Sequence, residues 1–382
     1  MAKSDNLRKA KEAKNDEFYT RLEDIEAEIS QHPDYVKQFE GKTVFCNCDD
    51  PEWSNFFKFF TLHFKQLKLK KLIATHFNSD GSPSYKIEWA GEMLNDNTVN
   101  LIKKNLLGNG DFRSEECIEL LKEAYIVVTN PPFSLYREYI AQLIQYGKKF
   151  VIIGNNNSIA YKEVFPLLKN GSMFLGYHSN ETMIMRVGEG YKYDQKVTDT
   201  INDGYKYGKI PAISWFTNLD LDKAHEPLIL TKNYYGNESY YPRYENYDAI
   251  ECGKVKDIPK DYLPCWYKCE HAGECTYAKT EGKEDKALCE MACNGEIGVP
   301  ITYMANHCSE QFEIKAADTE VANTVELENG EHRNGRFYIN AGETLDKDNN
   351  TNIIAQELRS SGAQEGKMRR LYSRLVIRRK KV

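Results

Sequence analysis

Short apolar runs alternate with helical patterns in the N-terminal part of the chain, and this alternation restricts the fold more than any other feature. Strands are predicted at 43–46, 71–75, 85–89, 125–129 and 150–154, and helices at 22–29, 55–64, 115–121 and in the stretch ending at Tyr146. Such an order is typical of an α/β protein with a mostly parallel sheet. Ligands bind beyond the carboxyl ends of the strands in these sheets. We therefore expect the loops after Cys46 and Thr129 to lie at one edge and to form the functional site.

Composition excludes membrane-spanning and secreted classes. The chain has 382 residues, of which 41% are hydrophobic, enough to bury the cores of two domains. No apolar run approaches the roughly 18 residues of a membrane span, and the charged N-terminus has no apolar signal segment. We therefore expect a cytoplasmic protein without membrane contact, in which the ten cysteines are not paired as disulfides.

The character of the sequence changes after about residue 230. Tyrosine, glycine, asparagine and charged residues become frequent there, and the alternation of strands and helices ends. We place a domain boundary near Tyr235, which gives domains at 1–235 and 236–382. The second domain carries a small cysteine-rich insert at 263–295.

Positive charge is concentrated near the end of the chain, although the net charge is −6. The segment 367–381 holds eight Lys or Arg residues and no Asp or Glu. We predict that Arg374, Arg378, Arg379 and Lys380 contact the phosphates of a nucleic acid. A merely solvated terminus is the alternative.

The tetrapeptide Asn130-Pro131-Pro132-Phe133 follows the strand predicted at 125–129 and precedes a helix. The Asn130 side-chain oxygen and the Pro131 carbonyl can accept the two N–H bonds of an amine such as that of adenine, and proline adds no competing N–H. Phe133 can stack on a planar base. The tetrapeptide therefore predicts methyl transfer to such a nitrogen, with a simple Asn-Pro turn as the alternative.

Further segments extend this pattern over nearly the whole chain. They are Asn15–Thr20, Cys46–Pro51, Ser54–Phe57, Gly110–Ser114, Trp215–Leu219, Gly298–Thr302 and Leu371–Lys380. Together with the tetrapeptide, they resemble the EcoRI-type adenine-specific DNA methyltransferase family. The resemblance implies a Rossmann-like fold and transfer of a methyl group from S-adenosylmethionine to N6 of a flipped adenine at a specific DNA site. Such enzymes act in restriction-modification or in orphan and phage modification systems.

The resemblance also implies roles for individual residues. The implied catalytic residues are Asn130, Pro131, Pro132 and Phe133, and the implied cofactor-binding residues are Phe18, Tyr19, Thr20, Asn47, Cys48, Asp49, Asp50, Pro51, Asp111 and Phe112. Asp49 or Asp50 would hold the methionine ammonium, and Asp111 and Phe112 would contact the cofactor's adenine. The loop with the two adjacent aspartates has no glycine, and no acidic residue follows the strand at 71–75. The residue that holds the ribose therefore stays unassigned.

The order of the motifs places cofactor binding and catalysis in 1–235 and target recognition in 236–382. The expected partners are double-stranded DNA and a cognate restriction endonuclease, and the expected state is a monomer. Two alternatives stay open. The same tetrapeptide chemistry serves RNA adenine and protein glutamine methyltransferases, and a catalytically silent nucleic-acid-binding relative would keep only the fold.

The insert at 263–295 suggests a metal. It contains Cys265, Cys269, Cys275, Cys289 and Cys293, and two pairs of them have three residues between the partners. Zinc ribbons usually have two residues between paired ligands, so the spacing is similar but looser. A metal can supply folding free energy that a small segment lacks. We therefore predict zinc or an iron–sulfur cluster, with unligated thiols as the alternative.

Overall fold

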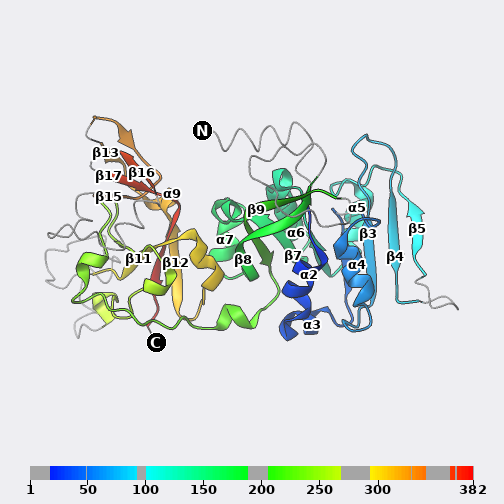
Figure 1. Ribbon diagram of the computed structural model, residues 1–382, viewed down its shortest axis with the longest axis horizontal. Coiled ribbons are helices and arrows are strands. Elements are labelled where there is room, and N and C mark those ends of the chain that lie inside the picture. Colours follow the sequence, from blue (N-terminus) through cyan, green and yellow to red (C-terminus); the bar gives the residue numbers. More distant parts are fainter. Residues whose placement is uncertain are drawn as a thin grey trace. The chain divides into compact units, whose positions relative to one another are not determined.

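The computed structural model of the protein describes residues 18–48, 50–92, 100–187, 205–267, 293–327, 329–340, 362–365 and 368–381. The chain folds into two compact units, Met1–Asp222 and Lys223–Val382 (Figure 1). The division falls earlier in the chain than the change in composition near Tyr235. Each unit has sheets and a buried apolar core of its own.

The first unit is built on one large sheet. Its described strands are β1 (Phe18–Tyr19), β2 (Thr43–Cys46), β3 (Lys71–Thr75), β4 (Tyr85–Trp89), β5 (Ile102–Asn105), β6 (Ile126–Thr129), β7 (Lys149–Asn155), β8 (Phe174–Val187) and β9 (Tyr207–Thr217). They lie in the order β1-β8-β9-β7-β6-β2-β3-β4-β5. The four central strands, β7, β6, β2 and β3, are parallel, as predicted. The outer strands on both sides are antiparallel.

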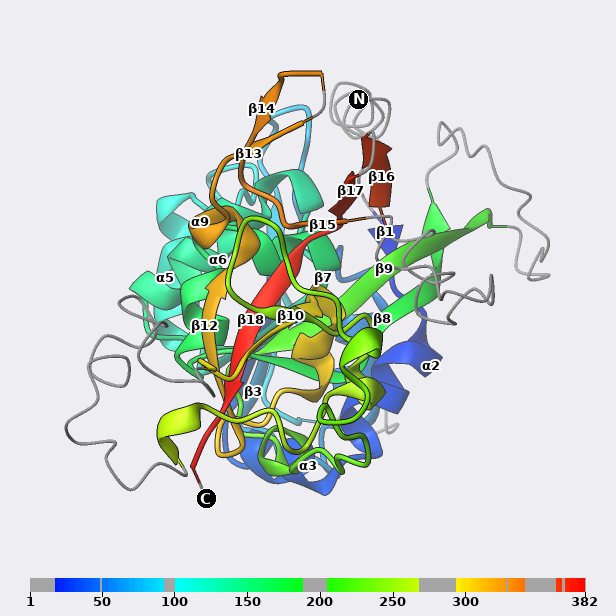
Figure 2. The same cartoon turned by 90° about the vertical axis from the view of Figure 1, so that its left-hand side faces the viewer.

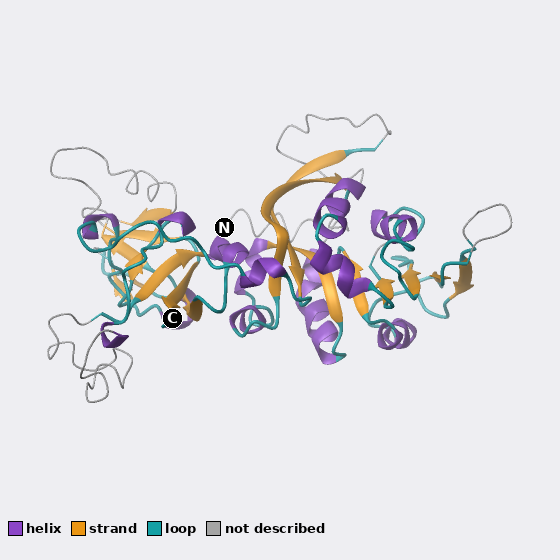
Figure 3. Ribbon diagram, turned by 90° about the horizontal axis from the view of Figure 1, so that it is seen from below, coloured by secondary structure: helices purple, strands orange, loops and turns teal. Residues whose placement is uncertain are grey.

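Helices lie on both faces of the central strands (Figure 3). They are α2 (Leu22–Ile25), α3 (Pro33–Phe39), α4 (Asn55–Leu62), α5 (Glu115–Glu123), α6 (Tyr136–Gln145) and α7 (Phe165–Lys169). Because both faces are covered, every residue of β2 and β6 is buried, which explains their uninterrupted apolar sequences. Ser54 caps α4 by accepting the N–H of Phe56 at 3.1 Å, and Ser114 caps α5 in the same way.

The order of the strands reverses at β2. The next strand, β3, pairs with one side of β2, whereas β6 pairs with the other side. At such a switch point the loops that follow the two adjacent strands, here β2 and β6, separate and leave a crevice between them. Here these loops begin at Asn47 and Asn130, so the topology brings two predicted motifs to one edge of the sheet.

The strands β8 and β9 are the longest of the unit, and the sequence pattern does not reveal them. Their register shifts three times, and Asn180 and Ala212 have positive φ angles of 60° and 59°. Such irregularities bend the strands and interrupt the two-residue alternation that identifies a strand in sequence. Trp215 of β9 is fully buried and packs edge-on against Phe56, with 5.9 Å between ring centroids.

The second unit is mostly β-structure. Its described strands are β10 (Ile250–Glu251), β11 (Glu296–Pro300), β12 (Phe312–Ala317), β13 (Val325–Glu326), β14 (His332–Arg333), β15 (Tyr338–Asn340), β16 (Gly362–Glu365), β17 (Met368–Leu371) and β18 (Arg374–Arg379), and its described α-helix is α9 (Asp318–Val321). They form a sheet β10-β11-β18-β12, a sheet β15-β17-β16 and the pair β13-β14. β18 therefore lies inside a sheet, between β11 and β12. Figure 2 shows β18 beside β12. Over the described ranges, no helix has the length and apolar character of a membrane span.

Candidate active site

A pocket of about 180 Å³ lies at the carboxyl ends of β2, β3 and β6. Its walls are formed by Phe18, Tyr19, Asn47, Cys48, Asp50, His76, Phe77, Gly110, Asp111, Phe112, Asn130, Pro132 and Leu135. These residues come from the N-terminal tract, from the loops after the three strands and from the turn before α5. Most of them belong to motifs that the sequence analysis selected separately, and the fold brings those motifs into one hollow.

Asn130 connects the tetrapeptide to the N-terminal tract. It is buried, and its Nδ2 donates to the backbone carbonyl of Phe18 at 2.5 Å. The ring of Phe18 also packs on Phe133, with 5.6 Å between centroids. The nitrogen of the Asn130 amide is thereby fixed by the fold, and this contact sets the orientation of the amide oxygen.

Asn47 follows β2, in the loop where the sequence has no glycine. Its Oδ1 accepts a hydrogen bond from the hydroxyl of Tyr139, which reaches the loop from the buried face of α6. Tyr139 also contacts Phe112 edge-on at 5.1 Å. An aromatic residue that the sequence analysis did not select therefore orients one wall residue and supports another.

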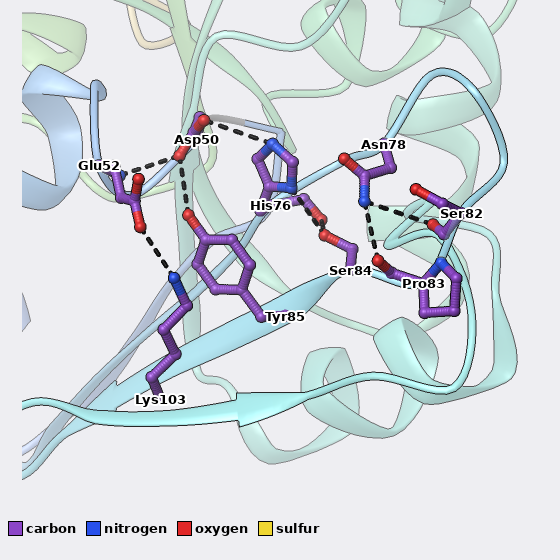
Figure 4. A network of polar contacts seen from close by, with 9 residues as sticks. All are labelled: Asp50, Glu52, His76, Asn78, Ser82, Pro83, Ser84, Tyr85 and Lys103. Atoms are coloured by element: carbon purple, nitrogen blue, oxygen red, sulfur yellow. Dashed lines mark hydrogen bonds and ion pairs between the residues drawn. The ribbon is translucent and has the colours of Figure 1, made fainter.

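Asp50 and His76 lie at the centre of a polar network between the loops after β2 and β3 (Figure 4). His76 Nε2 is 3.4 Å from Asp50 Oδ2, and the Tyr85 hydroxyl donates to Asp50 Oδ1 at 3.3 Å. Ser84 donates its hydroxyl to the His76 carbonyl at 2.7 Å, so its oxygen accepts from His76 Nδ1 at 2.8 Å. In neutral His76 the proton therefore sits on Nδ1. Nε2 and Asp50 Oδ2 are then two neighbouring acceptors.

Gly110 lets the turn before α5 approach the end of β3. Its φ is +80°, and a Cβ atom there would lie 1.9 Å from the carbonyl oxygen of His76, so only glycine fits. The adjacent Asp111 accepts from the Arg113 backbone N–H at 2.8 Å and from its guanidinium at 2.7 Å. These contacts hold the pKa of the Asp111 carboxyl below its ordinary value. Phe112 is buried beside it.

Known proteins identify the family. The family described as "Adenine-specific methyltransferase EcoRI" matches residues 6–265. "Type II methyltransferase M.EcoRI" of Escherichia coli is 43% identical over 319 residues, which cover 81% of this chain and 87% of that protein. This chain belongs to the EcoRI family of adenine-specific methyltransferases. "Type II methyltransferase M.MpnI" of Mycoplasma pneumoniae is 38% identical over 308 residues, covering 80% of this chain and 83% of that protein. No solved structure gives a significant match. The family resemblance predicted from the motifs is confirmed.

Methyltransferases of this family use S-adenosylmethionine, and the pocket suits it chemically. Asn47 Nδ2 is buried and has no hydrogen-bond partner among the described residues, so a ligand acceptor would satisfy it. His76 Nε2 and Asp50 Oδ2 offer the adjacent acceptors that a pair of ribose hydroxyls requires. Phe77 and Phe112 add aromatic surface for an adenine ring.

The pocket does not contain every predicted site residue. Four of them, Thr20, Pro51, Pro131 and Phe133, are not among the wall residues, and Asp49 lies outside the described residues. Conversely, the walls include four residues that the sequence analysis did not assign, namely His76, Phe77, Gly110 and Leu135. His76 and Phe77 directly follow β3, where such enzymes often carry an acidic residue that contacts the ribose. Their position after this strand could therefore have marked them as cofactor-binding residues.

The phosphate contacts predicted for the basic tail of the methyltransferase need a correction. Arg374 is buried, with its guanidinium 2.9 Å from Glu251, and Arg378 is buried, with Nε 2.6 Å from Glu313. The predicted phosphate contacts of these two arginines do not fit this structure, because each charge is already paired inside the sheet. Arg379 and Lys380 are more exposed.

Only the two ends of the predicted metal ligand set lie within the described residues. Cys265 donates its backbone N–H to the carbonyl of Cys293 at 2.9 Å, so these two cysteines lie next to each other. Burial raises the pKa of the Cys293 thiol, which disfavours the thiolate that binds metals. Cys269, Cys275 and Cys289 lie outside the described residues. Among the residues that the structure describes, no group of three or more His, Cys, Asp or Glu side chains could hold a metal.

Proposed function

We propose that this methyltransferase acts at specific sites in double-stranded DNA and methylates N6 of an adenine flipped out of the helix. The observation that supports this most strongly is the convergence of the Asn130 tetrapeptide and the Phe18-Tyr19 tract on one pocket. This pocket lies at the switch point of the sheet, where such folds bind nucleotides. Bound S-adenosylmethionine supplies the electrophilic methyl group.

The residues of the tetrapeptide hold the target base. In this proposal Asn130 Oδ1 and the Pro131 carbonyl accept the two N–H bonds of the adenine amine. These hydrogen bonds draw the nitrogen out of conjugation with the ring, so that its lone pair can attack the methyl carbon. The sulfur–carbon bond breaks as the nitrogen–carbon bond forms, the neutral thioether S-adenosylhomocysteine leaves, and the nitrogen loses its extra proton to water. Phe133 stacks on the base, and Phe18 supports Phe133 from the N-terminal tract. The Phe18 carbonyl keeps Asn130 in the required orientation.

Asp50 and His76 hold the ribose of the cofactor in this proposal, which replaces the contact with the methionine ammonium that the resemblance implied for Asp49 or Asp50. The two hydroxyls of a ribose donate to neighbouring acceptors, and the pair provides these at a separation of 3.4 Å. The pair thus replaces the acidic residue that other such enzymes place after the strand equivalent to β3. Asn47 Nδ2 donates to the amino-acid end of the cofactor, and Tyr139 holds this amide in place.

The two units take different roles in this proposal. Met1–Asp222 binds the cofactor and carries out the transfer, and Lys223–Val382 recognises the DNA sequence. Arg379 and Lys380 stay candidates for phosphate contacts. The relatives are named Type II methyltransferases, which supports a cognate restriction endonuclease as a partner. We also propose a monomer, which size-exclusion chromatography with light scattering tests.

A transfer assay tests the proposed function directly. The purified protein is incubated with S-adenosylmethionine carrying a labelled methyl group and with mixed double-stranded DNA, RNA or glutamine-containing peptide. We expect label only in DNA, recovered as N6-methyladenine after digestion to nucleosides. Label in RNA or peptide would support the rival enzymes, and cofactor binding without transfer would support a silent relative. Sequencing of modified bases in cells that express the protein then gives the site.

A metal in the cysteine-rich insert stays a prediction. Elemental analysis of protein purified without oxygen tests it, because zinc or iron is then counted per chain. A zinc stoichiometry near one would support zinc, and iron with labile sulfide would support a cluster. Absence of both would leave unligated thiols.

A further inference from the structure

A second hollow of the first unit adjoins the catalytic pocket. It has a volume of about 510 Å³, and Tyr19 lines both hollows. We call it the aromatic groove, after the side chains that dominate it. They are Tyr19, Trp53, Tyr205 and Tyr207, with the cations Lys58 and Arg186. Apart from Tyr19 and Pro51, which the family resemblance assigns to the cofactor, no wall residue of this groove has a role in the proposals above.

The aromatic groove exposes a large aromatic surface. Trp53 follows the cofactor loop and is 53% exposed, although an indole ring is usually buried. Tyr205 meets it edge-on, with 6.4 Å between centroids. The Arg186 guanidinium lies 3.3 Å from the centre of the Tyr205 ring and 5.5 Å from that of Trp53. Flat rings beside a cation on an open surface form a platform on which another planar group can stack.

The charge of the aromatic groove is positive. Arg21 lies on its wall, but Asp24 pairs with Arg21 at 2.8 Å. Glu52 also lies on the wall, and Lys103 pairs with it at 2.8 Å. In contrast, neither Arg186 nor Lys58 forms an ion pair with a described residue. The remaining charge can therefore meet an anion.

We propose that the aromatic groove binds the nucleotide next to the target adenine in the methylated strand. Its base stacks on Trp53, and its phosphate meets Arg186 and Lys58. Flipping removes the stacking partner of this neighbouring base, and an aromatic platform replaces that partner. Because Tyr19 lines both hollows, a strand whose adenine occupies the catalytic pocket passes directly into the groove. This inference rests on the proposed function.

The stacking arm of the test uses Trp53→Ala, with Trp53→Phe as the conservative variant. The DNA carries the mapped site, with 2-aminopurine beside the target adenine. In Trp53→Ala we expect about tenfold weaker DNA binding, a loss that one base–aromatic stack accounts for, and brighter 2-aminopurine. Trp53→Phe should retain most of the DNA affinity and most of the quenching of 2-aminopurine. Cofactor affinity and the thermal midpoint should stay at wild-type values.

The matched control is Tyr125→Ala. Tyr125 is 48% exposed and lies under the Lys42 ammonium at 4.4 Å, but it precedes β6 at the opposite ends of the strands. We expect Tyr125→Ala to leave DNA binding and the fluorescence unchanged. Equal effects of Tyr125→Ala and Trp53→Ala would overturn the proposal, as would wild-type fluorescence in Trp53→Ala.

The charge arm uses Lys58→Gln, an exposed substitution on α4 that tests the groove even where Trp53→Ala fails to fold. The slope of log affinity against log salt should flatten by about 0.9 when one phosphate contact is lost. Lys42→Gln is the control and should not change the slope. An unchanged slope in Lys58→Gln would overturn the phosphate contact. A wild-type protein that methylates no DNA would instead refute the proposed function itself, so the two failures are distinguishable.

Discussion

The proposed catalytic pocket of the first unit and strand β18 of the second unit both gather polar side chains in largely buried positions. In the pocket, Asn47 and Asp50 of the loop after β2 and Asn130 of the loop after β6 converge on a hollow. In β18, Arg374 and Arg378 are both buried and pair with Glu251 of β10 and Glu313 of β12. The difference teaches that a polar cluster serves a ligand only where the fold leaves space beside it. Otherwise it stabilises the fold.

The largest expected effect is on the stability of the second unit. Arg374→Ala leaves Glu251 buried without its charged partner, with only the Tyr244 hydroxyl of the described side chains donating to it, so the free energy of unfolding should fall by about 3–5 kcal/mol. Urea unfolding followed by tryptophan fluorescence and circular dichroism measures this. Replacing both residues by apolar ones, as in Arg374→Met with Glu251→Leu, should recover much of the loss. A stable Arg374→Ala protein with weakened DNA binding would show that this arginine serves the ligand after all.

Catalysis should fail when the pocket loses its central amide. Asn130→Ala should lower methyl transfer by about 10²–10³-fold, the scale of removing one hydrogen-bonding group that acts in the transition state. Cofactor affinity should change little, because Asn130 is assigned to the target base. Single-turnover transfer and equilibrium cofactor binding separate the two effects. Wild-type turnover in Asn130→Ala would mean that the tetrapeptide is only a turn.

Acid should weaken the second unit through His307. Burial, together with the charge of Lys380, lowers the pKa of His307 from its ordinary value of 6.5 to about 4. Below pH 6.5 the unfolded chain therefore binds a proton that the folded chain does not, so stability falls between pH 6.5 and pH 4. At pH 5 the loss should be about 2 kcal/mol. Urea unfolding at pH 7 and pH 5 measures it.

The control variant is His307→Gln, which should lose less stability than the wild-type protein between pH 6.5 and pH 4. Glu310 has a pKa lowered to about 2, mainly by its hydrogen bond to His225. Its contribution is lost only below the ordinary glutamate range, which separates it from the histidine. An undiminished loss in His307→Gln would assign the effect to other groups.

The smallest of these effects concerns the ribose. Asp50→Asn removes a charged acceptor and should weaken S-adenosylmethionine binding by about tenfold, as expected for one hydrogen bond to a charged group. Glu52→Gln is the matched control, because that carboxylate meets Lys103. Isothermal titration measures both. An equal effect of the two substitutions would indicate that Asp50 acts by holding the loop rather than by touching the cofactor.

The sequence by itself determined the local elements and the family. The apolar runs at 43–46 and 125–129 predicted buried strands, which the structure has at Thr43–Cys46 and Ile126–Thr129. The chemistry proposed for the tetrapeptide at Asn130 depends on four adjacent residues. Such features depend on neighbours along the chain, and sequence therefore predicts them.

Only the tertiary structure decided how these pieces meet. The pairing of His76 with Asp50, the support of Asn47 by Tyr139 and the long irregular β8 and β9 depend on residues distant in sequence. The basic tail shows the reason clearly. Its charges look alike in sequence, but Arg374 faces a buried glutamate whereas Lys380 does not, because β18 lies between two strands that cover one part of it. Burial is a property of the assembled fold, and a local pattern of charges does not contain it.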